Sequence, residues 1–241
     1  MKFRQIAVVV VGAAMMAVAS LGFVPPVSAG PPTTTNPATF AQLQTKLEAQ
    51  LTARQTQLAK LTTDVSKSTT LTSSDAATLS SRLAIETSNI AALIAKVPSD
   101  TTIAELRADQ QAMFKDNRVF VVMSPQVLLT IAADTVGAKA AAILSHGPTI
   151  TAALAARVDD KGYARAEERF AFSTAKATVA ESEMTGVSAE VLAQTPAGWP
   201  GNAHVFVTAR IKILRGRIDL IVSRSALRFV EHWIGHHPIP A

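Results

Sequence analysis

The sequence predicts an all-α protein, an extended bundle of five or six helices with a kinked central helix, preceded by a cleaved signal peptide. Apolar residues recur at spacings of three and four over long segments, which is the period of an amphipathic helix. The chain holds only 11 Gly in 241 residues, whereas a β-sandwich needs many Gly-rich turns. There is no Cys, so an exported domain would be held together by apolar burial alone.

Residues 1–29 are typical of a secretory signal peptide. Lys2 and Arg4 precede an uncharged apolar segment, and Val27-Ser28-Ala29 has the small-x-small spacing that a signal peptidase accepts. We expect cleavage before Gly30 and a protein that is secreted or associated with the cell envelope. An uncleaved N-terminal anchor is the alternative, because the apolar segment is just long enough to serve as one.

The mature chain is expected to begin with a linker and two helices. Residues 30–38 are rich in Pro and Thr and predict an extended linker, followed by a helical domain over residues 39–241. The first helix is expected over 39–66, with an apolar stripe in which Arg54 fills one gap. Thr72 and Asp75, three residues apart, resemble a capping box that opens a second helix ending near residue 97.

A segment of fifteen uncharged residues lies between Arg118 and Asp134. It is shorter than the stretch of about 20 apolar residues that spans a bilayer, and Pro125 does not fit a central strand. We interpret it as the middle of a buried central helix that is kinked at Pro125. This helix opens at a capping box formed by Thr102 and Glu105. A pair of strands and a membrane span are the alternatives, and no transmembrane helix is expected in the mature chain.

The central helix is expected to stop at His146-Gly147-Pro148, and shorter helices follow over residues 149–158, 164–184 and 187–194. Residues 195–201 form a break, after which Asn202 is expected to cap the last segment. Residues 205–224 can be read as a hairpin or as a helix. The helix is favoured because it aligns an arginine stripe beside one apolar side. The stripe is Arg210, Arg217, Arg224 and Arg228, and the apolar side is Val207, Ile211, Leu214, Ile218, Val222 and Phe229.

Three stretches of the chain carry a resemblance to other proteins: LTSSDAATLSSRL, RADQQAMFKDNRVFVVMSPQV and TPAGWPGN. They resemble a group of uncharacterised secreted α-helical proteins of actinobacteria, over roughly residues 40–215. The resemblance implies an all-α fold and export, and it implies no chemistry, since the motifs resemble capping and packing signals. The tail beyond Leu214 is rich in Ile, Arg and His and departs from the more Ala-rich helix of that group, so a shared role of the tail is not implied.

The C-terminus carries a candidate metal site. His232 and His236 are four residues apart, which places both imidazoles on one helical face, and Glu231 and His237 lie beside them. Such a set can hold zinc, nickel or copper. The alternative is a loose His group at a fraying helix end, since Gly235 and Pro238 follow closely. The spacing does not match the HExxH pattern of zinc proteases.

The arginine stripe is the second candidate site. Residues 202–241 hold six basic and two acidic side chains, while residues 30–201 have a net charge of −1. The positive excess of the mature chain therefore lies in its last forty residues. This stripe can contact an acidic envelope polymer or an anionic lipid surface. Alternatively, it can pair with acidic residues of neighbouring helices such as Glu181, Glu183 or Glu190.

No catalytic residues are predicted. The chain has no Cys, no GxSxG, no phosphate-binding loop and no dinucleotide-binding motif. Nucleic-acid binding is not expected of an exported chain whose basic residues are not interleaved with aromatic ones. The sequence therefore predicts a non-enzymatic protein without a cofactor, which binds a partner or envelope component through its helical surface. A metal or small-ligand carrier and a cationic membrane-surface binder are the alternatives.

Overall fold

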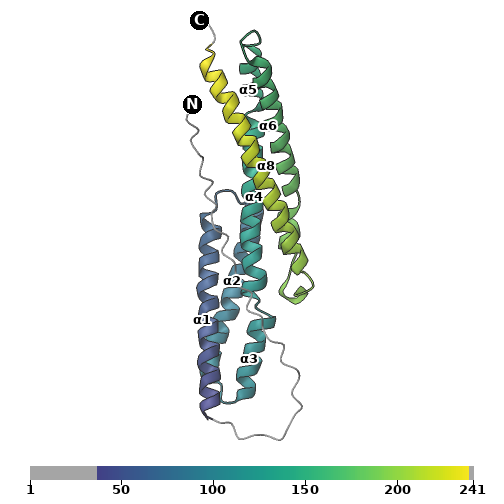
Figure 1. Ribbon diagram of the computed structural model, residues 1–241. Coiled ribbons are helices and arrows are strands. Elements are labelled where there is room, and N and C mark those ends of the chain that lie inside the picture. Colours follow the sequence, from purple (N-terminus) through teal and green to yellow (C-terminus); the bar gives the residue numbers. More distant parts are fainter. Residues whose placement is uncertain (1–36, 239–241) are drawn as a thin grey trace, which may run out of the picture. The chain divides into compact units, whose positions relative to one another are not determined.

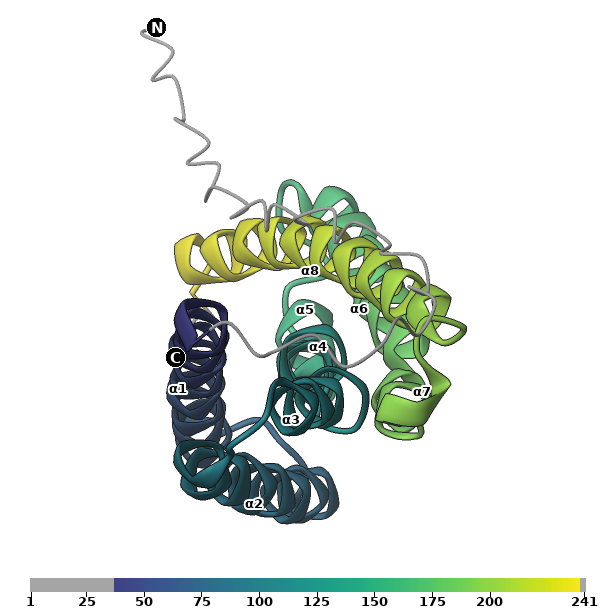
Figure 2. The ribbon, with the colours of Figure 1, turned by 90° about the horizontal axis from the view of Figure 1, so that it is seen from below.

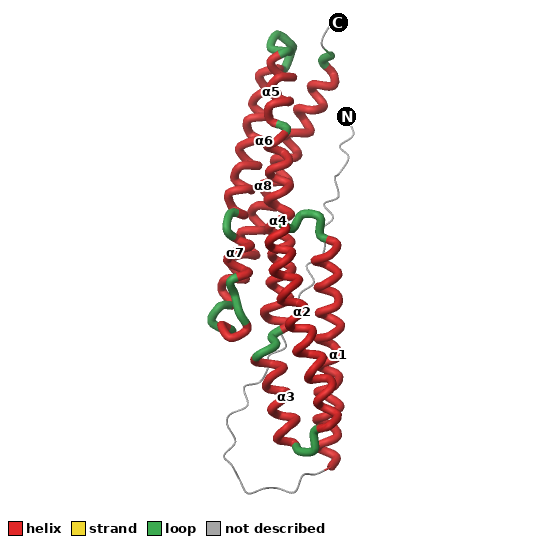
Figure 3. The backbone as a smooth tube through the Cα atoms, turned by 180° about the vertical axis from the view of Figure 1, so that it is seen from behind, coloured by secondary structure: helices red, strands yellow, loops and turns green. Residues whose placement is uncertain are grey.

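A computed structural model describes residues 37–238 of the chain. The expected signal peptide and residues 30–36 of the expected linker lie outside these residues. Figure 3 shows helices joined by short loops, with no strand in the described part of the chain, so the all-α prediction is confirmed. The helices are α1 (Pro37–Lys67), α2 (Ser73–Lys96), α3 (Ile103–Lys115), α4 (Ser124–Ser145), α5 (Gly147–Ala155), α6 (Tyr163–Met184), α7 (Val187–Leu192) and α8 (Ala203–His236).

Short 3₁₀ or π segments lie between some of these helices: η1 (Val97–Ser99), η2 (Val119–Met123) and η3 (Pro196–Gly198). The predicted break at residues 195–201 contains η3 and a cis peptide bond between Trp199 and Pro200. Asn202 precedes α8 as expected but does not cap it with its side chain. Instead, Asn202 Nδ2 donates to the carbonyl of Thr195 at 3.0 Å and so links the two ends of the preceding loop.

The two predicted caps form at the starts of α2 and α3. Thr102 and Glu105 make the full reciprocal capping box, with the Glu105 amide 3.2 Å from Thr102 Oγ1 and the Thr102 amide 2.9 Å from Glu105 Oε2. At α2, Thr72 Oγ1 accepts from the Asp75 amide at 3.1 Å. The Thr72 amide, however, donates to Asp134 of α4 at 3.1 Å rather than to Asp75. This cap therefore ties the start of α2 to α4.

The helices α1, α2 and α3 surround a core of large aliphatic side chains. The α1 stripe predicted from the sequence is buried and packs against α2 and α3, while Gln44 Nε2 donates to the carbonyl of Val97 and fixes the antiparallel α1–α2 register. Burying a Leu side chain stabilises a fold by roughly 2 kcal/mol. The fully buried residues of this core include Leu47, Leu51, Leu58, Leu61, Leu79, Leu83, Ile90 and Leu106.

The predicted long helix with a bend is present as α3 and α4, but the bend lies at residues 116–123, before Pro125, and not at Pro125 itself. The helix α3 ends at Lys115, and the π-helical turn η2 leads into α4, which begins one residue before Pro125. Pro lacks an amide hydrogen and clashes with the preceding turn inside a helix, but it fits the first turn, where the amide has no helical partner. The wide η2 turn, in which the Ser124 amide reaches the carbonyl of Val119, places Pro125 at that position.

The helix α4 is the central helix, and it contacts α1, α6, α7 and α8. Figures 1 and 2 show it between the α1–α2 pair and the α6–α8 pair. Two polar side chains of α4 fasten it to α7 and the residues after it. Gln126 Nε2 donates to the carbonyls of Val191 and Gln194, and Asp134 accepts from Ser188 at 2.6 Å.

The apolar segment around α4 is not enclosed on all sides. Phe120, Val121 and Leu128 are each about two-fifths exposed. Among the described residues, the stretch Ile103–Ala155 contains a window that is long and apolar enough to cross a membrane by composition, and half of that window is buried. The core helix of a soluble protein has the same composition, and α4 packs against helices on several sides as such a helix does.

The helices α6 and α8 pack antiparallel along a seam of mostly small side chains. Ser173 Oγ donates to the carbonyl of Ser223 at 2.9 Å, and Ser223 Oγ donates to the carbonyl of Ser173 at 2.8 Å. Gly216 lets α8 lie close to both α4 and α6, since a Cβ there would lie 3.0 Å from Val136 Cγ1 of α4 and 3.1 Å from the terminal methyl of Met184 of α6. The other small residues buried in the seam are Ala166, Ala177, Ala180, Ala209 and Ala226.

Candidate functional site

Residues 203–236 form one continuous helix, so the helical interpretation of the last segment is confirmed and the hairpin alternative is wrong. The helix buries one side at spacings of three and four against α4, α6 and α7. The residues on this buried side are Phe206, Ala209, Ile213, Gly216, Leu220, Ser223, Leu227 and Val230. The apolar side that the sequence analysis singled out points the other way.

Five large aliphatic residues of α8 are exposed, with exposed fractions between 47% and 69%. They lie on the side of the helix opposite to the seam, because their positions around the helix axis are about half a turn from those of the buried residues. Val222 and Phe229, the other two members of the predicted apolar side, are half-buried. We call the five exposed residues the α8 outer face: Val207, Ile211, Leu214, Ile218 and Ile221.

The predicted arginine stripe is exposed along the edge of the α8 outer face. Arg210, Arg217 and Arg224 recur every seven residues, so they form a column between the buried seam and the outer face, and Arg228, about five helical turns after Arg210, continues this column. Within residues 37–238, none of these four arginines has an acidic side chain within ion-pair distance. Their guanidinium groups are therefore available to a partner.

The acidic neighbours of α8 pair with lysines instead. Lys176 Nζ lies 2.8 Å from Asp219 Oδ1, and Lys212 Nζ lies 3.4 Å from Glu190 Oε2. Glu190 was one of the acidic residues expected to neutralise the arginine stripe, and its partner is a lysine on the opposite flank of α8. The described residues therefore do not form the ion pairs that the alternative expected between the arginine stripe and acidic residues of α6 and α7.

A shallow groove between α6 and α8 extends the apolar surface. Phe172 of α6, which is 42% exposed, and Ile221 of the α8 outer face line the same groove. At one end of the groove, the Arg165 guanidinium lies 5.1 Å from the centre of the Phe229 ring, a cation–π distance. Phe172 of α6 thus extends the apolar surface of the α8 outer face.

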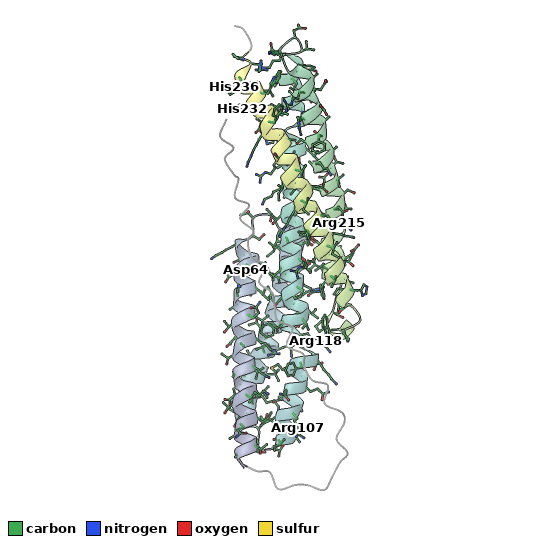
Figure 4. The ribbon with its side chains drawn as sticks, viewed as in Figure 1. Asp64, Arg107, Arg118, Arg215, His232 and His236 are labelled. Atoms are coloured by element: carbon green, nitrogen blue, oxygen red, sulfur yellow. The ribbon has the colours of Figure 1, made fainter. Side chains whose placement is uncertain are left out.

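The C-terminal His residues lie at the end of α8, where Figure 4 labels His232 and His236. Their ring centres are 4.1 Å apart, and His236 Nδ1 lies 2.8 Å from the carbonyl of His232. His237 stacks on Trp233, and its carbonyl accepts from Arg157 Nε. Glu231 does not complete a set, because no group of three His, Asp or Glu suited to a metal forms among the described residues. The structure thus brings together two of the four predicted ligands.

Two charged residues are buried in the core of α1, α2 and α3, and neither has a counter-ion within residues 37–238. Arg54 lies about 5 Å from the ring centres of Phe114 and Phe120, and burial lowers its pKa below the ordinary value. Glu86 is 8% exposed, and burial raises the pKa of its carboxyl group. These groups lie apart from the α8 outer face, and their packing within the helical core accounts for them.

The sequence analysis found the arginine stripe and most of the apolar side of α8, but it missed which side faces the solvent. It also missed Ile221 and the contribution of Phe172. The available signal was the second stripe of α8, Ala209-Ile213-Gly216-Leu220-Ser223, whose small residues match those of α6. Small residues at spacings of three and four permit close helix packing, so this stripe is the one that a partner helix covers.

No family model matches this chain, and no curated protein or solved structure shows a significant match to it. The function is therefore argued from the geometry alone.

Proposed function

We propose that the protein is a non-enzymatic binding protein that engages an acidic partner or envelope component through the α8 outer face. The observation that carries this proposal is one helix side with five exposed aliphatic side chains beside three arginines that have no acidic partner in the described part of the chain. Single exposed apolar residues are ordinary, but a contiguous apolar patch edged by polar groups is typical of an interaction surface.

The chemistry of this surface supports binding rather than catalysis. Its side chains are aliphatic groups and guanidinium groups, which cannot act as a nucleophile or as a general base near neutral pH. Arginine suits recognition of carboxylate or phosphate because its planar group donates two parallel hydrogen bonds. A partner surface that is both acidic and apolar can contact the arginines and the aliphatic side chains at the same time.

Export is part of the same proposal. The signal-peptide pattern of residues 1–29 and the Cys-free composition are consistent with a protein that acts outside the cytoplasm. The resemblance to secreted actinobacterial proteins agrees with that location. The acidic component is then expected among the polymers and lipids of the cell envelope.

Co-sedimentation of the chain over residues 35–241, which forms one compact unit, with isolated envelopes of the source organism tests the proposal. We expect the chain to sediment with the envelopes, and we expect Ile211→Ser combined with Leu214→Ser and Ile218→Ser to abolish this. The matched control is Ile85→Ser with Val158→Ser, since both residues are exposed aliphatics outside α8. Failure of the unaltered chain to sediment, or an equal loss in the control, would contradict the proposal.

A metal carrier is the second candidate function, and the closeness of the His232 and His236 rings, whose centres are 4.1 Å apart, favours it. Two imidazoles one helical turn apart can chelate a zinc, nickel or copper ion. An ion that binds only the folded chain raises its Tm by mass action. We expect excess zinc to raise the Tm if this candidate is correct, and His236→Ala to remove the rise. An unchanged Tm with each of the three metals would reject it.

A further inference from the structure

The α8 outer face is the convex surface of one helix rather than a pocket, although Ile221 at its end also lines the shallow groove beside α6. Val207 and Ile221 are fourteen residues apart, so the exposed aliphatic column extends over about 21 Å of one helix. A convex surface cannot enclose a small molecule, which is normally bound in a concave site. The partner must therefore be an extended surface.

The arginines run parallel to the α8 outer face. Arg210, Arg217 and Arg224 are separated by two helical turns each, or about 10 Å, and none of them has an acidic partner within the described residues. A helix with aliphatic side chains on one side and basic side chains along their edge is the pattern of helices that lie in a membrane interface. The aliphatic groups enter the boundary between headgroups and acyl chains, and the guanidinium groups meet lipid phosphates.

The fold presents this side of α8 without rearrangement. The seam side of the helix stays buried against α4 and α6, where Gly216 and the Ser173–Ser223 pair hold the helices close. The backbone that carries the exposed side chains is therefore fixed before binding, and no helix has to leave the bundle. This arrangement lowers the conformational entropy lost on binding.

A second copy of the chain fits the same surface poorly. An antiparallel pairing of two α8 outer faces brings the two arginine columns against each other, and a parallel pairing brings each column against the flank that carries Arg215. Like charges face each other in both cases, which opposes association. Residues 202–241 carry a net charge of +4, so an anionic surface is the complementary partner.

We propose that α8 docks the folded protein onto an anionic lipid surface, with Ile211, Leu214 and Ile218 inserted at the headgroup boundary and Arg210, Arg217 and Arg224 on the lipid phosphates. This inference rests on the proposed function and names its partner. An anionic lipid surface accounts for both the aliphatic residues of the α8 outer face and the arginines beside them. A soluble acidic polymer would use only the arginines and leave the aliphatic residues in water.

Sedimentation with sucrose-loaded vesicles tests this inference, using the chain over residues 35–241. We expect binding to vesicles of equal parts phosphatidylglycerol and phosphatidylcholine, and little binding to pure phosphatidylcholine. Replacing Arg210, Arg217 and Arg224 by Gln should weaken the binding about 100-fold, at roughly fivefold for each basic residue. Replacing Ile211, Leu214 and Ile218 by Ser should abolish it. Since all six side chains are exposed, circular dichroism should show an unchanged helix content.

The matched control is Lys46→Gln with Lys60→Gln and Lys67→Gln, which removes three exposed charges from α1. This variant should bind anionic vesicles as the unaltered chain does. No binding to anionic vesicles, or an equal loss in the α1 variant, would overturn the inference. If the unaltered chain is a dimer and the Ser variant is a monomer, the partner of the α8 outer face is a second copy of the chain, and the inference is overturned. Binding to envelopes without binding to vesicles would reject the lipid surface as the partner but would agree with the proposed function. Failure to bind either envelopes or vesicles would reject both the lipid surface and the proposed function.

Discussion

The α1–α2–α3 region and the α6–α8 pair bury opposite kinds of side chain. In the first region the fully buried residues are mostly Leu, and the helices expose a single large apolar residue, Ile85. In the α6–α8 pair the seam consists largely of Ala, Ser and Gly, and the two helices expose seven large apolar residues. The same apolar periodicity thus marks the core in one region and the solvent side in the other.

The difference teaches what close helix packing does to the rest of a helix. Small residues let two backbones approach, and the helices then have no room for large side chains between them. Large aliphatic residues on such a helix face another neighbour or the solvent. On α8 they face the solvent, beside arginines that form no ion pair among the residues that the structure describes. This combination is the basis of the binding proposal.

The largest expected change in the free energy of unfolding comes from truncating a leucine in the core of α1, α2 and α3. Leu58 is fully buried in α1, so Leu58→Ala removes buried methyl groups and leaves a cavity. We expect a loss of about 3 kcal/mol in the free energy of unfolding, measured by urea denaturation. A loss below about 1 kcal/mol would show that α1 packs more loosely than the structure indicates.

The next effect comes from filling the small-residue seam. Gly216→Leu introduces a side chain where even a Cβ would lie 3.0 Å from Val136 and 3.1 Å from Met184. Overpacking of this kind destabilises a fold by about 2 kcal/mol. Urea denaturation of Gly216→Leu measures this loss. Stability equal to that of the unaltered chain would mean that α8 does not pack closely against α4 and α6 at Gly216.

The buried serine pair should contribute less. Ser173→Ala removes one of two reciprocal hydrogen bonds between α6 and α8, at a cost of about 1 kcal/mol. We expect Ser223→Ala to have a similar effect. A double-mutant cycle should show coupling between the two residues, because they share one contact. Strictly additive losses would argue against the reciprocal geometry.

The burial of Glu86 in the core of α1, α2 and α3 can be tested by measuring stability at different pH values. Burial raises the pKa of its carboxyl group in the folded protein above the unfolded value. Below the unfolded pKa both states are protonated, so Glu86 costs nothing there. The cost grows as pH rises through the unfolded pKa and is complete above the folded pKa. Glu86→Gln should therefore raise the free energy of unfolding at pH 7 and have little effect at pH 4. Destabilisation by Glu86→Gln at pH 7 would contradict the burial of this carboxyl group.

The smallest effect is expected on the α8 outer face. Ile218 is 52% exposed, so Ile218→Ala should change the free energy of unfolding by less than about 0.5 kcal/mol. The comparison with Leu58→Ala is direct, since both changes truncate an aliphatic side chain at a helical position. A loss near that of Leu58→Ala would place Ile218 in a core.

Much of the fold was predictable from the sequence because its signals are local. The cap formed by Thr102 and Glu105 and the stripe of α1 depend on residues within a few turns of each other, and both are confirmed. The bend that lies before Pro125 was predicted at Pro125 itself. The π-helical turn that precedes Pro125 depends on how the chain enters α4 and has no local residue signature.

The candidate site was only partly predictable. The arginine stripe follows from spacing alone, and the structure leaves it exposed as one helix column. The exposure of the apolar side does not follow from spacing, because α8 carries two stripes and the neighbours decide which one is covered. The separation of His237 from His232 and His236 depends on its stacking against Trp233, a tertiary contact.

Thiol reactivity in single-cysteine variants tests the central claim most directly, since the chain has no Cys of its own. Ile218→Cys lies on the α8 outer face, and Ile213→Cys lies in the seam, where the native side chain is 3% exposed. We expect the thiol of Ile218→Cys to react with an aromatic disulfide reagent in the native protein at nearly the rate seen in urea. The thiol of Ile213→Cys should react only after unfolding. The opposite pattern, or equal protection of both thiols, would contradict the outward orientation of the aliphatic side of α8 and with it the binding proposal.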